Sequence, residues 1–257
     1  MKRVSIFVYG VICYAVFLAT FVYAIGFVSG VFVPKAMDSV PAAPFGQALV
    51  INICLLGIFA VQHSVMARPA FKRWWTGIIP APAERSTYVL LSSVALILLF
   101  ALWEPMGGVV WQVSNQVWRI ALHAAAGFGW LLVLASTFFI NHFDLFGLRQ
   151  VWLELRGKSY TPLKFGTPGL YKVVRHPLYL GWLFAFWCTP VMTAAHLVFA
   201  LATTAYIFVA IVFEERDLTA MHPEYRLYQK RVPMLFPTHR RWRTEDTLEV
   251  KASEASA

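Results

Sequence analysis

Charged residues are scarce in this chain: only 14% of its 257 residues are aspartate, glutamate, lysine or arginine, and 59% are apolar. Soluble domains carry roughly 25% charged residues, so the deficit excludes an ordinary soluble domain. The mean hydropathy is positive. The composition therefore indicates a polytopic membrane protein.

Cysteine is also rare. Cys13, Cys54 and Cys188 are the only three, they lie far apart in apolar runs, and none forms a CxxC pair. A disulfide framework or a cysteine metal site needs closer or paired cysteines, so neither is predicted. Small buried hydrophobic side chains are the expected role, and composition predicts no metal site.

Acidic residues are few, and the net charge is +9. With the N-terminus in the cytoplasm, Lys35 and Arg119 are the only two of the 22 lysines and arginines that fall outside. Positive charge concentrates in the cytoplasmic loops of membrane proteins. This rule accounts for the charge without a nucleic-acid partner. It predicts cytoplasmic N- and C-termini, and we expect a bacterial inner membrane.

The chain is rich in long apolar runs. Such a run can cross the membrane, because about 20 apolar residues in a helix span ~30 Å of hydrocarbon. The runs cover residues 4–33, 45–67, 86–103, 120–140 and 178–213. The first is too long for a signal-peptide core of about 7–15 residues, so we expect a retained helix. The last is interrupted by Thr189-Pro190, which predicts two helices of about 18 residues joined near residues 190–196.

The predicted fold is therefore all-α: a polytopic membrane bundle of five to six transmembrane helices with a C-terminal helical hairpin. The final pair forms either two crossings or a re-entrant hairpin that does not fully span. We expect N-terminal transmembrane helices over residues 1–140 and a C-terminal functional region over 141–243. The latter includes an amphipathic interfacial helix at 144–157. Residues 244–257 have the composition of a disordered tail.

Polar side chains gather where the spans meet the predicted cytoplasmic face. They are Gln62 and His63; Asn141, His142 and Asp144; Arg175, His176 and Tyr179; and Glu214 and Glu215. Each has an ordinary structural explanation, such as a positive anchor for Arg175. A hairpin, however, returns the chain to one face, which brings Arg175 and His176 within reach of the paired carboxylates. Such a set suits a ligand that carries a carboxylate, an ammonium group and ribose hydroxyls.

Two sets of motifs resemble known enzymes. "GLYKVVRHPLYLGW", "EERDL" and "HPEYRLYQKRVPMLFP", within residues 165–237, resemble the isoprenylcysteine carboxyl methyltransferase and phospholipid methyltransferase superfamily of membrane enzymes. Upstream, "QHSVMARPAFKRWW", "ERSTYVLLSS" and "INHFDLFGLRQVW" are similar to the bacterial methanethiol S-methyltransferases. The resemblance implies methyl transfer from S-adenosyl-L-methionine to a small thiol, with methanethiol giving dimethyl sulfide.

The resemblance also implies a cofactor site on the cytoplasmic side. Its amino-acid end would be cradled by the RHPxYxG motif and the backbone from Gly169 to Tyr171, and its ribose or amino group would lie near the acidic pair. Tyr225 and Tyr228 match a YxxY pattern expected to line the lid. The implied cofactor-binding residues are Gly169, Tyr171, Arg175, His176, Pro177, Tyr179, Gly181, Glu214, Glu215 and Tyr225.

Methyl transfer to sulfur requires a thiolate, and a free thiol of pKa ~8.5 is only a few per cent ionised at neutral pH. A base would help. We expect His142, oriented by Asn141 or Asp144, with His63 as the competing candidate; a cation such as Arg85 or Arg149 would instead stabilise the anion. Alternative acceptors are a lipid amine, a prenylcysteine carboxylate or another thiol. A more remote alternative is a non-enzymatic haem or quinone subunit. The oligomeric state stays open.

Overall fold

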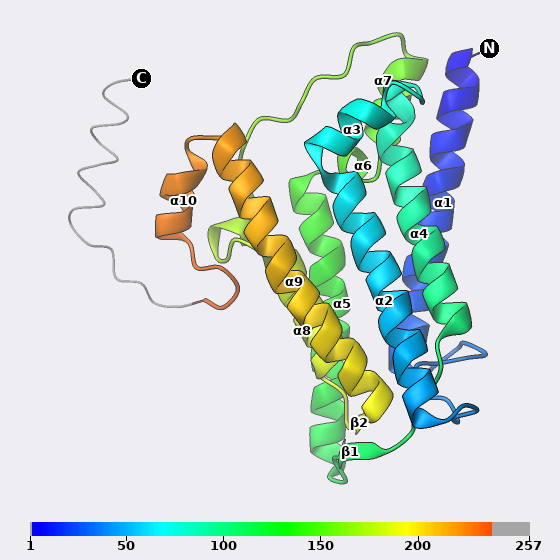
Figure 1. Cartoon of the computed structure of the whole chain (residues 1–257). Coiled ribbons are helices and arrows are strands. Elements are labelled where there is room, and N and C mark those ends of the chain that lie inside the picture. The colour runs from blue at the N-terminus through cyan, green and yellow to red at the C-terminus, as the bar shows by residue number, and fades with distance from the viewer. Residues whose placement is uncertain (1, 238–257) are drawn as a thin grey trace.

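A computed structural model describes residues 2–237, so the predicted disordered tail at 244–257 lies outside the described residues. Figure 1 shows a bundle of long helices with two short strands at one end. Within the described range, five helices are long and apolar enough to cross a membrane. They are α1 (Lys2–Ser29), α2 (Phe45–Ala67), α4 (Glu84–Leu102), α5 (Gln116–Ile140) and α9 (Ala194–Met221). The predicted all-α membrane bundle is confirmed.

The two ends of the bundle differ in the elements they carry. Near the end where α1 begins lie α3 (Pro69–Trp75), η1 (Ala81–Ala83), α6 (His142–Leu145) and α7 (Leu148–Leu155). We call this the inner end. The same half of the bundle holds η2 (Gly169–Lys172) and α10 (Tyr225–Arg231). The opposite, outer end carries the antiparallel strands β1 (Val109–Gln112) and β2 (Val191–Thr193), in which Val109 pairs with Thr193 and Gln112 with Val191.

Local sequence sets the ends of several helices. Arg68 is extended because a residue that precedes proline is disfavoured in the helical region, and Pro69 then starts α3 at a position where its missing N–H costs nothing. The side chain of Asn115 accepts hydrogen bonds from two amides at the start of α5. Thr193 caps α9 in the same way. These caps fix where the crossings begin.

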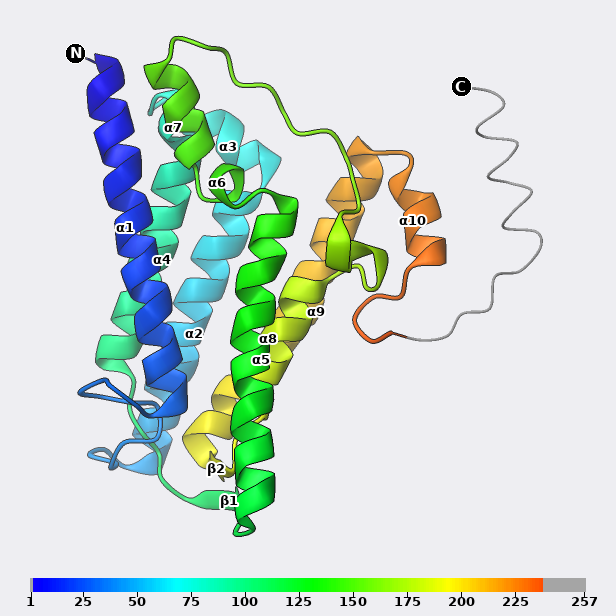
Figure 2. The same cartoon turned by 180° about the vertical axis from the view of Figure 1, so that it is seen from behind.

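The C-terminal hairpin is unequal, and the prediction of two helices of about 18 residues is wrong. Helix α8 (Pro177–Trp187) has only 11 residues, which is ~16 Å and too short to cross ~30 Å of hydrocarbon. Helix α9 has 28 residues. The cause lies at both ends of α8. Residues 188–193 leave the helix to form β2, and the chain before Pro177 is largely non-helical, so α8 begins part-way down the bundle (Figure 2).

Two glycines fix α8 against α5. A Cβ on Gly129 would lie 2.6 Å from the Ala185 nitrogen, and one on Gly181 would lie 2.8 Å from the Gly129 oxygen. Only glycine permits this backbone approach. The crossing holds the start of α8, and therefore Arg175 and His176, at a set depth beside the inner end of α5.

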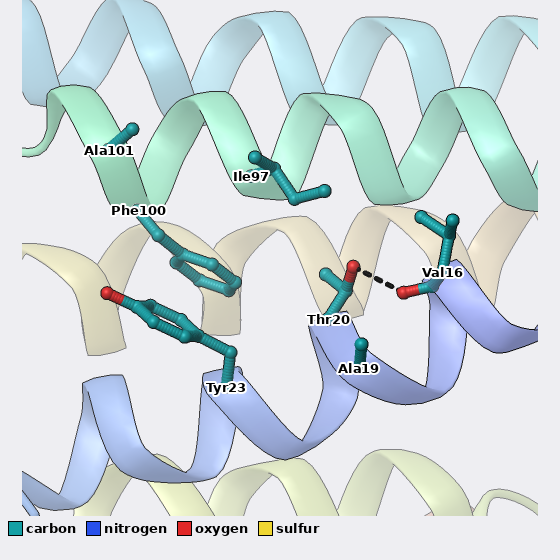
Figure 3. Close-up of a pocket in the computed structure, with 7 residues that line it drawn as sticks. All are labelled: Val16, Ala19, Thr20, Tyr23, Ile97, Phe100 and Ala101. Atoms are coloured by element: carbon teal, nitrogen blue, oxygen red, sulfur yellow. Dashed lines mark hydrogen bonds between the residues drawn. The ribbon is translucent and has the colours of Figure 1, made fainter. Parts of the chain in front are cut away.

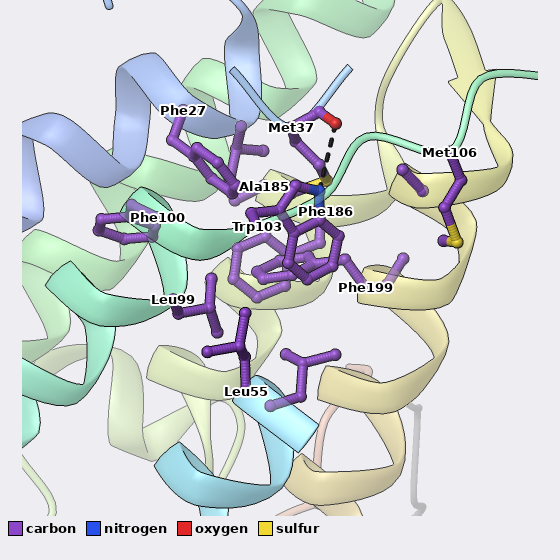
Figure 4. Close-up of a cluster of buried hydrophobic side chains, with 14 of the residues drawn as sticks. Phe27, Met37, Leu55, Leu99, Phe100, Trp103, Met106, Ala185, Phe186 and Phe199 are labelled. Carbon is purple, nitrogen blue, oxygen red and sulfur yellow. Dashed lines mark hydrogen bonds between the residues drawn. The ribbon is translucent and has the colours of Figure 1, made fainter. Parts of the chain in front are cut away.

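The larger of two buried apolar clusters is built mainly from the outer parts of the long helices, and Figure 4 shows its side chains in close-up. Trp103 is completely buried there, packs edge-on against Phe27 and Phe199, and donates its indole N–H to the Met37 oxygen at 3.3 Å. Nearby, the Nδ1 of the buried His196 lies 3.1 Å from an Asp38 oxygen, and its Nε2 lies 2.9 Å from the Phe186 carbonyl oxygen. These contacts tie the outer loops to the bundle and give His196 a structural role.

A hollow of about 410 Å³ lies between α1 and α4 (Figure 3). Its lining is almost wholly apolar, and the Thr20 hydroxyl there already donates to the Val16 oxygen at 2.7 Å. No ionisable carboxylate, histidine or basic side chain lines it. This hollow therefore offers nothing for group transfer, and the polar chemistry lies at the inner end.

Candidate functional site

The start of α8, the inner part of α9 and α10 come together around one pair of carboxylates. The chain before α8 pairs with the segment after α10: the Arg175 amide donates to the Pro233 oxygen at 2.9 Å, and the His176 amide donates to the Met234 oxygen at 3.1 Å. Glu214 and Glu215 approach from α9. The predicted meeting of the two ends of the hairpin is therefore present.

Glu215 is the centre of this arrangement. Its Oε1 accepts from Arg175 Nε at 2.7 Å and lies 2.9 Å from His176 Nε2, and its Oε2 accepts from Gln229 Nε2 at 2.9 Å. The Tyr225 hydroxyl donates to Oε1 at 3.4 Å. One carboxylate thus ties α8, α9 and α10 together, and charge-assisted bonds of this kind are the stronger ones.

Glu214 is the accessible member of the pair. Its side chain is 44% exposed, whereas that of Glu215 is 15% exposed. Its Oε2 accepts from the Tyr179 hydroxyl at 2.9 Å and lies 3.9 Å from His176 Nδ1. No described side chain is hydrogen-bonded to its Oε1. Glu214 can therefore accept hydrogen bonds from a ligand, while Glu215 holds the protein together.

Arg175 is already occupied in this arrangement. Besides Glu215, its guanidinium donates to two main-chain oxygens near the end of α10, those of Gln229 at 2.9 Å and Val232 at 2.7 Å. Its side chain is 11% exposed. The geometry gives Arg175 the task of docking α10; the predicted contact with a ligand carboxylate stays a prediction.

The predicted tyrosines stand around the acidic pair. The Tyr228 hydroxyl donates to the Tyr171 oxygen at 2.6 Å, which links α10 to η2. Burial, aided by Glu215, raises the pKa of Tyr225, and burial, aided by Glu214, raises the pKa of Tyr171. Burial raises the pKa of Tyr228 to about 12, against the lowering effect of the Arg175 charge. These hydroxyls therefore stay protonated and act as hydrogen-bond donors.

Three other predicted residues act through the backbone. Gly169 has φ +53, and a Cβ there would lie 2.3 Å from the Phe139 ring, so glycine lets η2 turn against α5. Pro177 is fully buried at the start of α8. Gly181 lies at the crossing with Gly129. The geometry gives them roles in shaping the site, and no ligand contact is tested.

His142 lies in a different environment, between α1 and α5. Its Nε2 lies 2.8 Å from the Tyr14 hydroxyl and its Nδ1 lies 2.8 Å from Thr137 Oγ1. Its ring stacks on Phe138 at 4.2 Å, and the residue is 3% exposed. Burial lowers the pKa of His142. Both ring nitrogens are thus satisfied, and no described contact joins His142 to the acidic pair.

The residues predicted to orient His142 have other partners. Asn141 accepts from the Asp144 amide at 3.1 Å and so caps α6. Asp144 accepts from Arg149 at 2.7 Å, and Arg149 also donates to the Thr161 oxygen at 3.0 Å. Arg149 is therefore neutralised by a carboxylate, which leaves Arg85 as the better candidate for an anion-stabilising cation.

His63 lies in a polar cluster inside the bundle. The Tyr88 hydroxyl of α4 lies 2.9 Å from His63 Nε2, and Ser92 Oγ lies 3.2 Å from His63 Nδ1. On the other side, Ser64 Oγ lies 3.1 Å from the Tyr206 hydroxyl of α9. Sequence reasoning missed Tyr88, Ser92 and Tyr206. The available signal was the spacing of Arg85, Tyr88 and Ser92, which places three polar side chains on one face of a span.

Metal chemistry finds no ready ligand set. Within residues 2–237, no three histidine, cysteine, aspartate or glutamate side chains gather closely enough to hold a metal ion. The three cysteines are free thiols. The polar groups around Glu215 and His63 instead provide hydrogen bonds and charge.

Comparison with known proteins gives close relatives along nearly the whole chain. The chain is 56% identical over 238 residues to a protein of Crocosphaera subtropica named methanethiol S-methyltransferase, covering 92% of this chain and 93% of the relative. It is 57% identical over 238 residues to one of Mycobacterium tuberculosis with the same name, covering 92% and 98%. Methanethiol S-methyltransferase 1 of Bradyrhizobium diazoefficiens is 53% identical over 235 residues, covering 91% and 82%. No family model and no solved structure matches.

Proposed function

We propose that this chain, which belongs to the methanethiol S-methyltransferase family, transfers a methyl group from S-adenosyl-L-methionine to methanethiol and releases dimethyl sulfide. The observation that carries the proposal is the accessible Glu214 carboxylate beside His176 and Tyr179, where the start of α8 meets the inner part of α9. Relatives that are more than 50% identical to this chain over the aligned residues bear that name.

The methyl donor fits the side chains around Glu214. The donor offers ribose hydroxyls and an ammonium group, and Glu214 Oε1 is an acceptor that no described side chain occupies. The tyrosine hydroxyls of this region stay protonated and supply donors. The donor's carboxylate is better matched by the backbone of Gly169 to Tyr171, because Arg175 is held by Glu215 and α10. S-adenosyl-L-methionine would supply a methyl group already activated on a sulfonium.

The protein then has three tasks. It must align the thiol in line with the methyl group, remove the thiol proton and exclude water. We assign the methyl-donor side to the region 141–243 and the acceptor side to the helices of residues 1–140. For the base, we favour His63 over His142. The Tyr206 ring of α9, the helix that carries Glu214, lies 6.4 Å from the His63 ring, and the Tyr206 hydroxyl lies 3.1 Å from Ser64 Oγ.

The chain is an integral membrane protein, with five helices suited to crossing a membrane within its described part. We propose that the inner end faces the cytoplasm of a bacterial cell, since the loops rich in lysine and arginine lie there. Contact with the lipid bilayer also suits the reaction. A small apolar thiol partitions into lipid, and so does the apolar product.

The test is product analysis with the purified protein in lipid nanodiscs. S-adenosyl-L-methionine and methanethiol are added, and headspace dimethyl sulfide is measured by gas chromatography. Dimethyl sulfide above the no-protein control supports the proposal. Methylation of a lipid amine or a prenylcysteine, with methanethiol left untouched, would contradict the acceptor. A purified protein with a Soret band and no transfer would point to the haem-subunit alternative.

A further inference from the structure

A hydrogen-bonded cluster of His63, Tyr88 and Ser92 lies between α2 and α4, away from the Glu215 network, and the Tyr206 ring of α9 lies edge-on to His63 at 6.4 Å. Tyr88 is half-buried and its hydroxyl lies 2.9 Å from His63 Nε2. His63 also stacks on Phe59, with ring centroids 5.2 Å apart and planes inclined by 25°. The His63 ring is therefore fixed in position, with its edge turned toward two hydroxyl groups.

The hydrogen bonds leave one acceptor unused. A neutral histidine donates through one ring nitrogen and accepts through the other. The Tyr88 oxygen lies 2.9 Å from Nε2 and 3.1 Å from Nδ1, and Ser92 Oγ lies 3.2 Å from Nδ1. In the tautomer that carries its proton on Nδ1, Nε2 accepts from Tyr88, so the single hydroxyl proton of Tyr88 is directed at His63. Within the described residues the Tyr88 oxygen is hydrogen-bonded to His63 alone, so a lone pair of that oxygen can accept a proton from a ligand.

A cation without an ion-pair partner accompanies this acceptor. Arg85 lies three residues before Tyr88 on the same face of α4, and its charge acts on Tyr88 and on Lys72 of α3. Within residues 2–237, neither Arg85 nor Lys72 has a carboxylate within ion-pair distance, whereas the neighbouring Arg68 is held by Asp217 at 3.0 Å.

The balance of charge at this end favours an anion. Burial lowers the pKa of Lys72, with Arg85 as the next contributor; Glu84 and Asp217 oppose the effect and Arg68 adds to it. Of the four charged groups that act on Lys72, Arg85 and Arg68 are positive, and Asp217 is already paired with Arg68. A ligand with one negative charge would complete the set.

Tyr179 connects this cluster to the proposed methyl-donor site. Its hydroxyl donates to Glu214 at 2.9 Å, and it lies within electrostatic range of both Tyr206 and Tyr88. The accessible carboxylate is thus hydrogen-bonded to a tyrosine that interacts electrostatically with the cluster. A thiol held at Tyr88 would approach the methyl donor from the side of α2 and α4.

We propose that His63, Tyr88 and Arg85 form the acceptor subsite, in which a small thiol passes its proton to Tyr88 and is held as a thiolate by Arg85. This inference rests on the proposed function and adds to it the place and the means of thiol activation. Tyr88 is the catalytic residue here, since it contacts the thiol, and His63 acts through Tyr88.

The thiol S–H bond breaks and its proton moves to the Tyr88 oxygen, while the Tyr88 proton moves to His63 Nε2, which becomes an imidazolium. The thiolate electron pair forms the new S–CH₃ bond, and the sulfonium–CH₃ bond breaks with its pair returning to the donor's sulfur. Two neutral sulfides result, and His63 then releases one proton to water on the cytoplasmic side.

The chain contains a matched control. Tyr14 and His142 form a second histidine–tyrosine pair at 2.8 Å, between α1 and α6. Tyr14→Phe removes the same hydroxyl from the same kind of pair, and Tyr14 has no part in either proposed site. A purely structural role for Tyr88 would give both variants similar, small effects.

The experiment compares Tyr88→Phe, His63→Gln and Tyr14→Phe with the wild type. Turnover and the KM for methanethiol are measured from dimethyl sulfide between about pH 6.5 and 8.5, and binding of S-adenosylhomocysteine is measured by calorimetry. We expect Tyr88→Phe and His63→Gln to lower turnover at neutral pH by roughly 100-fold or more, the range for loss of acid–base help. Their rates should rise about tenfold per pH unit because they depend on free thiolate, and Tyr14→Phe should keep the wild-type profile.

Two substitutions test whether the subsite needs the positive charge of Arg85. Arg85→Lys should keep most of the wild-type turnover, whereas Arg85→Gln should raise the KM for methanethiol about tenfold or more, with unchanged binding of S-adenosylhomocysteine.

The inference is overturned if Tyr88→Phe and His63→Gln bind S-adenosylhomocysteine normally and keep wild-type turnover and pH profile. It is equally overturned if these variants, or Arg85→Gln, lose S-adenosylhomocysteine affinity instead, because the cluster would then bind the methyl donor. If Tyr88→Phe does not fold, the turnover and pH profile of His63→Gln decide whether the inference stands. Failure of the wild type to make dimethyl sulfide would defeat the proposed function itself, which is a separate result.

Discussion

Replacing Glu215 by glutamine tests whether this carboxylate docks α10. The wild-type carboxylate accepts from Arg175 at 2.7 Å, His176 at 2.9 Å and Gln229 at 2.9 Å. Glutamine keeps the size but removes the charge, and its amide N–H₂ faces other donors. The Arg175 guanidinium, which is 11% exposed, is then left with two main-chain oxygens and no counter-charge.

The size of the effect follows from these contacts. Breaking a fully buried ion pair costs about 3–5 kcal/mol, and a hydrogen bond to a charged group contributes about 1.5–3 kcal/mol. Glu215 is 15% exposed and Arg175 keeps its contacts to Gln229 and Val232, so we expect about 2–3 kcal/mol. Because the bonds join α9 to α10, this loss falls on the docking of α10. It corresponds to a roughly 30- to 150-fold larger undocked population.

Hydrogen exchange measured by mass spectrometry gives the readout. Amides of α10 (Tyr225–Arg231) should exchange roughly 30- to 150-fold faster in Glu215→Gln if they exchange through undocking. Glu224→Gln is the matched control. The Glu224 side chain is 56% exposed, and its Oε1 makes a long contact of 3.8 Å with His222 Nδ1. Equal protection of α10 in Glu215→Gln and in the control would refute the role assigned to Glu215.

Two further predictions concern the backbone and the pH response. Gly169→Ala should lower the melting temperature and weaken S-adenosylhomocysteine binding, because φ +53 costs an alanine about 1–2 kcal/mol and its Cβ would meet Phe139; Gly166→Ala, with nothing within 4 Å, should change little. Burial lowers the pKa of His142 in the folded state. The neutral His142 therefore contributes fully to stability above the unfolded-state pKa of ~6.5, and this contribution is lost as the pH falls from there toward the lower folded-state pKa. The melting temperature should therefore drop more between about pH 7.5 and 5.5 in the wild type than in His142→Gln; equal drops would contradict this reasoning.

Composition and apolar runs were sufficient to predict the membrane bundle. The run at residues 45–67 matches α2 in both bounds, because Pro44 and the Arg68-Pro69 pair end the helical pattern at both sides. The unequal hairpin was beyond such reasoning. Thr189-Pro190 interrupts its apolar run, but the unequal lengths of the two helices depend on the pairing of β2 with β1, a strand some eighty residues earlier, which no local pattern reveals.

The candidate site was likewise predictable only in part. The meeting of Arg175 and His176 with the acidic pair was predictable because a hairpin must bring its ends together, whereas the RHPxYxG motif came from the resemblance to known methyltransferases. Their partners were not predictable: Arg175 binds two main-chain oxygens of a segment over fifty residues later, and main-chain acceptors leave no trace in side-chain patterns. Tyr88 was passed over because a tyrosine in an apolar span reads as packing until His63 is seen 2.9 Å away.

The most direct test of the proposed function follows the methyl group itself. The purified protein is given S-adenosyl-L-methionine with a trideuterated methyl group together with unlabelled methanethiol, and the headspace is analysed by mass spectrometry. Direct transfer predicts dimethyl sulfide with the label on one methyl group only, formed in equal amount with S-adenosylhomocysteine. Unlabelled dimethyl sulfide, or S-adenosylhomocysteine formed without any dimethyl sulfide, would contradict transfer to methanethiol.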